Sequence, residues 1–186
     1  MLALIALLAG SAHAEPTSYG REPRVAYLER ALGVLEAMAP SEVTALEDAL
    51  QAGARNQCKA SYGQPPVSCL VQVARTYCEA RPVAERAACH LVADLALTNQ
   101  LGESELVDER TRIKLMNASG GFRAAMRAEL RARYAGLTAE MTLTATGSTP
   151  AARVDEFCSG TRRTLTWQRC AAAIIWYIGT HRGDPS

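Results

Sequence analysis

The segment CKASYGQPPVSCLVQVARTYCEARPVAERAACH, residues 58–90, holds four of the six cysteines of the chain. Two C-x10-C units follow one another in it, and proline lies near the middle of each. Because proline ends or begins a helix, these positions predict turns between helices. The segment therefore predicts two helical hairpins, each with a cysteine on either side of its turn.

Helix geometry selects among the ways of pairing these four cysteines. Residues 67–80 carry a helical pattern, so Cys69 and Cys78 lie about 13.5 Å apart along one axis. A disulfide requires Cα atoms within about 7 Å, which excludes that pair. Antiparallel packing brings Cys58 level with Cys69, and Cys78 level with Cys89. Crossed pairing would leave axial gaps of about 9–10 Å, so we expect the pairs Cys58–Cys69 and Cys78–Cys89.

The two remaining cysteines, Cys158 and Cys170, pair by elimination. This pairing requires residues 159–165 to be mostly loop, because a helix beginning at Arg162 would carry Cys170 about 12 Å from the turn. Thr166 would then cap the final helix. The sequence thus predicts three local disulfides.

Other cysteine chemistries fit the spacing poorly. Zinc sites use C-x2–4-C spacing, which does not occur in the sequence. Covalent haem uses C-x-x-C-H, whereas Cys89-His90 follows two alanines. The even cysteine count leaves no thiol over for catalysis. We therefore expect no metal and no cofactor.

The N-terminus indicates export. Residues 2–9 are apolar, and Ala12-His13-Ala14 forms an A-x-A cleavage pattern before Glu15. We expect residues 1–14 to be a cleaved signal peptide and residues 15–186 to be the mature domain, although no Lys or Arg precedes the apolar run. In an exported chain the cysteines indicate a disulfide framework, in the periplasm or in secreted material. Of 20 basic residues 18 are Arg, which suggests a GC-rich bacterial genome.

Composition and periodicity predict an all-α, single-domain bundle of about seven to eight helices stapled by three local disulfides. The net charge of +1 gives no global field for nucleic acid, and the apolar runs are too short to span a membrane. We expect loops at Asn99–Ser104 and at residues 141–146 (MTLTAT), where threonine alternates with apolar residues. Pro40 would end one helix, and Ser41 would cap the next. The expected helices are residues 23–38, 42–60, 67–80, 83–98, 105–117, 122–135, one from Thr149-Pro150 onward, and 166–179.

The final helix is apolar on all sides from Ala171 to Ile178. Such a helix is normally buried, so we expect it at the centre of the bundle, tethered by Cys170. The alternative is a hydrophobic face for a partner.

Two groups of residues are candidate sites. His90 and Asp94 share a helix face at i,i+4 spacing and could orient an imidazole as a general base. Arg123, Arg127 and Arg131 form a stripe that could contact an anion or an acidic partner. The alternative for His90 and Asp94 is a surface or interhelical His–Asp pair without a functional role. The alternative for the arginines is a solvated helix face whose charge is partly balanced by Glu129.

These observations favour a non-catalytic role. We expect an extracytoplasmic protein that binds or scaffolds another extracytoplasmic protein in a bacterial envelope or secreted assembly. The alternative is a small secreted hydrolase acting on lipid or cell wall through His90 and Asp94. In the favoured interpretation, replacing His90 with Ala leaves the activity largely intact.

Overall fold

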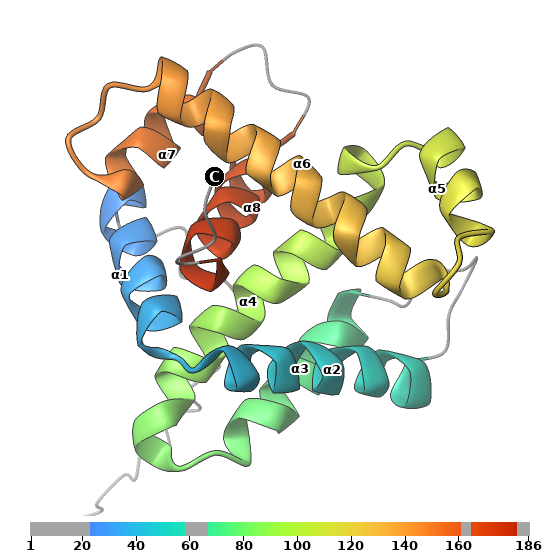
Figure 1. Cartoon of the computed structure of the whole chain (residues 1–186). Coiled ribbons are helices and arrows are strands. Elements are labelled where there is room, and N and C mark those ends of the chain that lie inside the picture. The colour runs from blue at the N-terminus through green and yellow to red at the C-terminus, as the bar shows by residue number, and fades with distance from the viewer. Residues whose placement is uncertain (1–22, 59–66, 161–164, 182–186) are drawn as a thin grey trace, which may run out of the picture.

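The structure, a computed structural model, describes residues 23–58, 67–160 and 165–181. Within these ranges the chain forms eight α-helices and no strand, which confirms the predicted all-α bundle (Figure 1). The predicted signal peptide and the turn at residues 63–66 lie outside the described residues. In chain order the helices are α1 (Arg24–Ala37), α2 (Pro40–Gln57), α3 (Val67–Glu79), α4 (Val83–Leu106), α5 (Glu109–Met116), α6 (Phe122–Thr144), α7 (Pro150–Cys158) and α8 (Trp167–Thr180).

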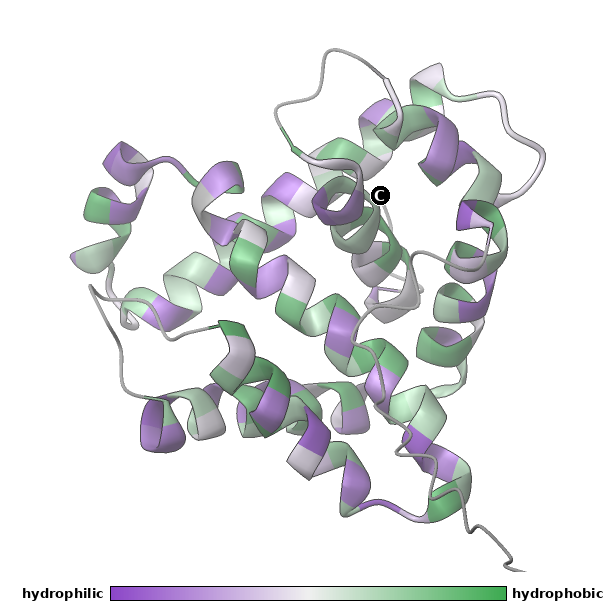
Figure 2. Cartoon of the chain, turned by 180° about the vertical axis from the view of Figure 1, so that it is seen from behind, coloured by the Kyte–Doolittle hydropathy of each residue, from purple (hydrophilic) through white to green (hydrophobic). Residues whose placement is uncertain are grey.

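Helix α8 lies at the centre of one group of helices. It packs against α1, α4, α6 and α7, and its residues from Cys170 to Trp176 are all buried. The predicted central position of the apolar helix is therefore confirmed. Most of the other helices alternate hydrophilic and hydrophobic residues, as helices with one buried face do (Figure 2).

Helix α4 joins this group to a second one. With 24 residues it is about 36 Å long, and it packs against α3 at one end and against α8 and α6 along its length. Helix α3 in turn packs against α2. Both contacts of α3 carry a disulfide, Cys58–Cys69 and Cys78–Cys89, with Cα atoms 5.8 Å and 5.5 Å apart. These are the two predicted pairs.

The third disulfide joins α7 to α8. Cys158 ends α7, Cys170 lies in the first turn of α8, and their Cα atoms are 5.7 Å apart. The Thr166 hydroxyl accepts a hydrogen bond from the Arg169 backbone N–H at 3.4 Å, so the predicted cap is confirmed. Residues 161–164 of the predicted loop lie outside the described residues.

The expected loop at Asn99–Ser104 is wrong, because α4 continues through it to Leu106. Gly102 is buried, and a Cβ built on it would lie 3.5 Å from the aliphatic part of the Arg169 side chain on α8. Arg169 also forms an ion pair with Glu105 one turn further along α4. Packing against α8 thus keeps the helix intact through a glycine that lowers its intrinsic propensity.

The expected loop at residues 141–146 is also largely wrong, since α6 extends to Thr144. The hydroxyls of Thr138, Thr142 and Thr144 each donate to the backbone carbonyl four residues earlier, at 2.9, 2.8 and 2.8 Å. A threonine whose hydroxyl forms this hydrogen bond fits within a helix. The alternation of threonine with apolar residues, which is typical of a strand, therefore does not end α6.

Two helix starts also differ from the sequence-based expectation. Helix α1 ends at Ala37, before Pro40, close to the predicted end at residue 38. Pro40 is itself the first residue of α2, a position that suits a residue without a backbone N–H. The Glu42 carboxylate, and not Ser41, stabilises this start by accepting a hydrogen bond from the Ala39 N–H at 3.0 Å. The helix expected at 105–117 begins later as α5, where the Asp108 carboxylate accepts from the Thr111 N–H at 2.8 Å.

Candidate functional site: a polar cleft between α2, α4, α6 and α8

Two adjoining cavities lie between α2 and α6, and residues of α4 line both of them. The first, of about 490 Å³, is closed on one side by α8 and the end of α1. The second, of about 690 Å³, extends along α2 and α6 away from α8. Five residues line both cavities, so the two cavities form one continuous space, which we call the cleft. The shared residues are Gln51, Gln100, Glu103, Arg127 and Leu130.

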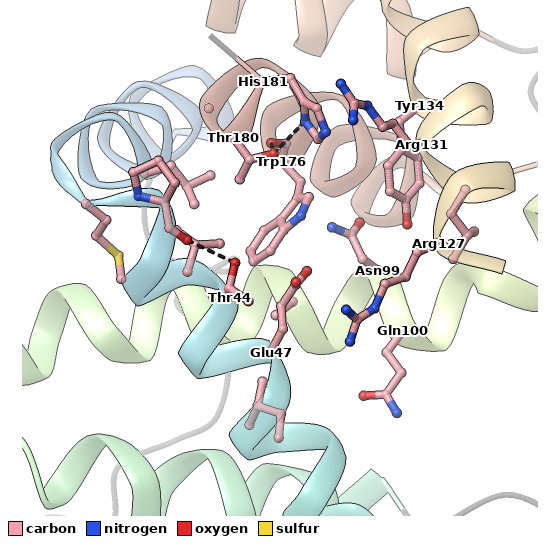
Figure 3. A pocket seen from close by; sticks show the side chains of 18 of the residues that line it. Thr44, Glu47, Asn99, Gln100, Arg127, Arg131, Tyr134, Trp176, Thr180 and His181 are labelled. Carbon is pink, nitrogen blue, oxygen red and sulfur yellow. Dashed lines mark hydrogen bonds between the residues drawn. The ribbon is translucent and has the colours of Figure 1, made fainter. Parts of the chain in front are cut away.

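The first cavity has a largely apolar wall. Val43 and Leu50 from α2, Leu130 from α6 and Leu35 from α1 line it together with Trp176 of α8. The Trp176 ring points into the space between α2 and α6 (Figure 3). This lining and a volume of a few hundred Å³ are typical of small-ligand sites, which combine apolar walls with a few polar groups.

Two half-buried carboxylates enter this apolar setting. Glu47 comes from α2, one turn after Val43, and Glu103 comes from the last turns of α4. Burial raises the pKa of both carboxyls, and the charge of Glu47 raises the pKa of Glu103 further. Arg127 and Arg112 partly offset these effects, on Glu47 and Glu103 respectively. Neither carboxylate forms a hydrogen bond or an ion pair with any described residue.

Asn99 lies on α4 one turn before Glu103 and lines the first cavity. It is only 8% exposed, and neither its Nδ2 nor its Oδ1 has a hydrogen-bond partner among the described residues. Its amide lies among Glu47, Trp176 and Tyr134 (Figure 3). A buried amide without partners is unfavourable by about 1–3 kcal/mol, so natural proteins keep few of them.

Tyr134 completes the polar part of the first cavity from α6. Its ring is buried, and its hydroxyl forms no hydrogen bond with a described residue. Burial raises the pKa of this phenol, and the charges of Glu103 and Glu47 raise it further. The phenol therefore stays protonated and can donate a hydrogen bond into the cavity.

The predicted arginine stripe borders the cleft. Arg131 lines the first cavity, Arg123 the second, and Arg127 both. Arg127 Nη2 lies 3.1 Å from Asp48 Oδ1 on α2, so this ion pair crosses the cleft. Glu129, which we expected to balance part of the charge of the stripe, forms an ion pair with Arg133 at 2.8 Å.

The second cavity is basic. Arg55 from α2 and Arg123 from α6 line it and have no ion-pair partner among the described residues. Arg112 of α5 also lines it, with Glu109 Oε2 3.8 Å from its Nη1. The cleft therefore presents unpaired acceptors in the first cavity and unpaired guanidinium groups in the second.

The predicted His90–Asp94 pair lies elsewhere, nearer the start of α4, and lines neither of these two cavities. Both side chains are half-buried. Burial raises the pKa of Asp94, and the charge of His90 partly offsets this. The structure therefore places the arginine stripe at the cleft and the His–Asp pair away from it.

Sequence reasoning missed the polar residues of the first cavity, although a signal for them exists. Val43, Leu46 and Leu50 form the buried stripe of α2, and Glu47 occupies a stripe position between them. Asn99 lies four residues after buried Leu95 on α4. A polar residue in a stripe of apolar ones indicates a site, but the expected loop at 99–104 hid Asn99 and Glu103.

The described segments show neither a cluster of metal-ligating residues nor a membrane-spanning helix. They contain no group of three or more His, Cys, Asp or Glu residues able to hold a metal ion. No helix in those segments is long and apolar enough to cross a membrane. Comparisons of the chain with protein-family models, with curated proteins and with solved structures found no match.

Proposed function

We propose that this chain is a non-catalytic binding protein of a bacterial envelope or a secreted assembly, and that the cleft holds its ligand. The observation that carries the proposal is Asn99, whose buried amide has no partner and lies in a cavity with the unpaired carboxylates of Glu47 and Glu103. Such groups destabilise the free protein, and a ligand that bonds to them offsets the penalty.

The compartment supports a binding role outside the cytoplasm. Three disulfides indicate an oxidising, non-cytoplasmic environment. We place the protein in the periplasm or in secreted material, where the ligand belongs to another extracytoplasmic protein or is released from one.

A substitution that fills the first cavity with a large side chain tests the proposal. Thr44 lies on an exposed turn of α2 at the rim of the first cavity, so Thr44→Trp should block it. The matched control is Thr76→Trp, at an exposed position of α3 that lines neither cavity. Each purified protein is incubated with an envelope extract, and retained compounds are identified by mass spectrometry. We expect a compound retained by wild type and Thr76→Trp, lost with Thr44→Trp, and recovered chemically unchanged.

The same experiment tests the hydrolase alternative. Burial raises the pKa of Asp94 beside His90, an arrangement that general-base chemistry can use. If the retained compound is recovered as cleavage products, and His90→Ala lowers their formation about 10²–10⁴-fold with folding unchanged, the hydrolase replaces the binding protein. Equal retention of the compound by wild type, Thr76→Trp and Thr44→Trp would show that the cleft is not the binding site.

A further inference from the structure

We infer that the cleft binds a short zwitterionic peptide, with its α-ammonium group between Glu47 and Glu103, its first peptide bond on Asn99, and its carboxylate toward Arg55 and Arg123. This inference rests on the proposed binding function and names the ligand class. Four steps lead to it, and each uses a group left without a partner among the described residues.

The first step concerns the charge of the ligand in the first cavity. Glu47 and Glu103 are half-buried, repel each other, and have no ion pair. Arg127, whose charge lowers the pKa of Glu47, already pairs with Asp48 at 3.1 Å. A cation between the two carboxylates removes the repulsion and offsets their burial, because an opposite charge favours the ionised form.

The second step identifies the cation as an ammonium group. A calcium-sized ion takes six to eight oxygen ligands, and no cluster of three acidic or histidine side chains occurs within residues 23–58, 67–160 and 165–181. An ammonium group has three N–H donors, which match the carboxylates of Glu47 and Glu103 and the oxygen of Tyr134. The Trp176 ring lies in the same cavity, a setting that also favours an organic cation (Figure 3).

The third step concerns Asn99. Its Oδ1 accepts and its Nδ2 donates, and both atoms are unpaired in a side chain that is 8% exposed. A peptide bond offers the complementary N–H and C=O. A polyamine would satisfy the oxygen and leave the nitrogen without an acceptor, so an amine followed by a peptide bond fits the cavity better.

The fourth step concerns the other end of the ligand. The second cavity is continuous with the first and carries the unpaired guanidinium groups of Arg55 and Arg123. Guanidinium groups bind carboxylates through paired hydrogen bonds. The acidic first cavity and the basic second cavity therefore orient a peptide with both ends free.

Calorimetric titration of the full mature protein with tri-alanine tests the inference. We expect binding that weakens about tenfold or more when the peptide is N-acetylated, and severalfold when its carboxylate is amidated. Glu47→Gln, Glu103→Gln and Asn99→Leu should each weaken binding about tenfold or more. Arg55→Gln with Arg123→Gln should remove the preference for the free carboxylate. The matched control is Glu85→Gln, at an exposed position of α4 that lines neither cavity, and it should bind like wild type.

Thermal unfolding of every variant shows whether a loss of binding reflects a loss of folding. Equal affinity for the N-acetylated peptide would overturn the ammonium site. Tighter binding of spermidine than of tri-alanine, blocked by Thr44→Trp, would replace the peptide with a polyamine. If tri-alanine does not bind at about 1 mM while the extract still yields a compound sensitive to Thr44→Trp, the peptide inference fails and the binding function stands. If neither binds, both fail.

Discussion

At the residue scale, the most informative positions are polar residues where a core residue would be expected. Glu47 lies at a position of the buried face of α2, and Asn99 lies at such a position of α4. The side chain of each lacks a hydrogen-bond or ion-pair partner among the described residues. An apolar residue would stabilise the free protein at either position. In many proteins, residues that lower the free energy of unfolding and form no stabilising contact in the folded chain mark functional sites.

This trade-off predicts that Glu47→Gln and Glu103→Gln each stabilise the free protein at neutral pH. Burial raises the pKa of both carboxyls above 4.5, so the folded state binds more protons than the unfolded state just above that pH. Stability is therefore lost as pH rises through the raised pKa values. We expect a gain of about 0.5–1 kcal/mol at pH 7 and almost none below pH ~4, measured by urea unfolding across pH.

Differences from wild type at each pH isolate the two carboxyls. Other charged groups also line the first cavity, and the comparison with wild type at the same pH controls for them; they are Glu36, Arg127, Arg131 and His181. Glu85→Gln, which is exposed, should show no such pH-dependent gain. A loss of stability at pH 7 in both cleft variants would show that the carboxylates form favourable contacts inside the free protein.

At the element scale, packing and local hydrogen bonds decide where helices continue, and packing decides how closely they approach one another. Helix α4 continues through Gly102 because α8 packs against it, and α6 continues through its threonines because their hydroxyls bond to the backbone. Gly53 of α2 lies close against Val73 of α3. A Cβ built there would lie 2.2 Å from Val73 Cγ1, far inside van der Waals contact.

Glycine-to-alanine substitutions in two helices test this packing. Gly53→Ala should force α2 and α3 apart and reduce the free energy of unfolding by about 1–3 kcal/mol. Gly33→Ala in α1 is the matched control, since nothing lies within 4 Å of its added Cβ. There alanine should raise stability by up to about 1 kcal/mol through its helix propensity. Chemical denaturation measures both changes, and stabilisation by Gly53→Ala would contradict the tight contact.

At the scale of the whole molecule, the disulfides reinforce a topology that they do not create. Each joins helices that follow one another in the chain, at sequence separations of 11 or 12 residues. The first and last described helices, α1 and α8, lie side by side (Figure 1), and no disulfide joins these two helices; side-chain packing holds them, with the Arg24 guanidinium 4.6 Å from the centroid of the Trp167 ring. Gly179 marks this contact, because a Cβ there would meet Leu35 Cβ at 2.7 Å.

Removing the last disulfide should therefore weaken the fold without changing it. We expect Cys158→Ala with Cys170→Ala to lower the free energy of unfolding by about 3 kcal/mol, as the loop-entropy model gives for so short a loop. The dependence on denaturant and the near-ultraviolet circular dichroism should stay close to wild type. Loss of the near-ultraviolet signal before denaturant is added would show that this disulfide determines the packing of α7 and α8.

The sequence by itself determined the features that depend on neighbours along the chain. Proline positions and the rise per residue of a helix were enough to predict two of the disulfides, and the third followed by elimination, because each closes a short hairpin whose geometry is local. The all-round apolar character of α8 was enough to predict its central place. The threonine cap of α8 followed from local chemistry in the same way.

Tertiary structure alone decided the length of α4 and the composition of the cleft. Whether a glycine interrupts a helix depends on what packs against it, and Gly102 meets Arg169 from a helix 67 residues further on. Glu47, Asn99, Tyr134 and Trp176 come from four helices, and no spacing in the chain relates them. Burial without partners is a property of their shared surroundings, so it emerged only when α2, α4, α6 and α8 were brought together.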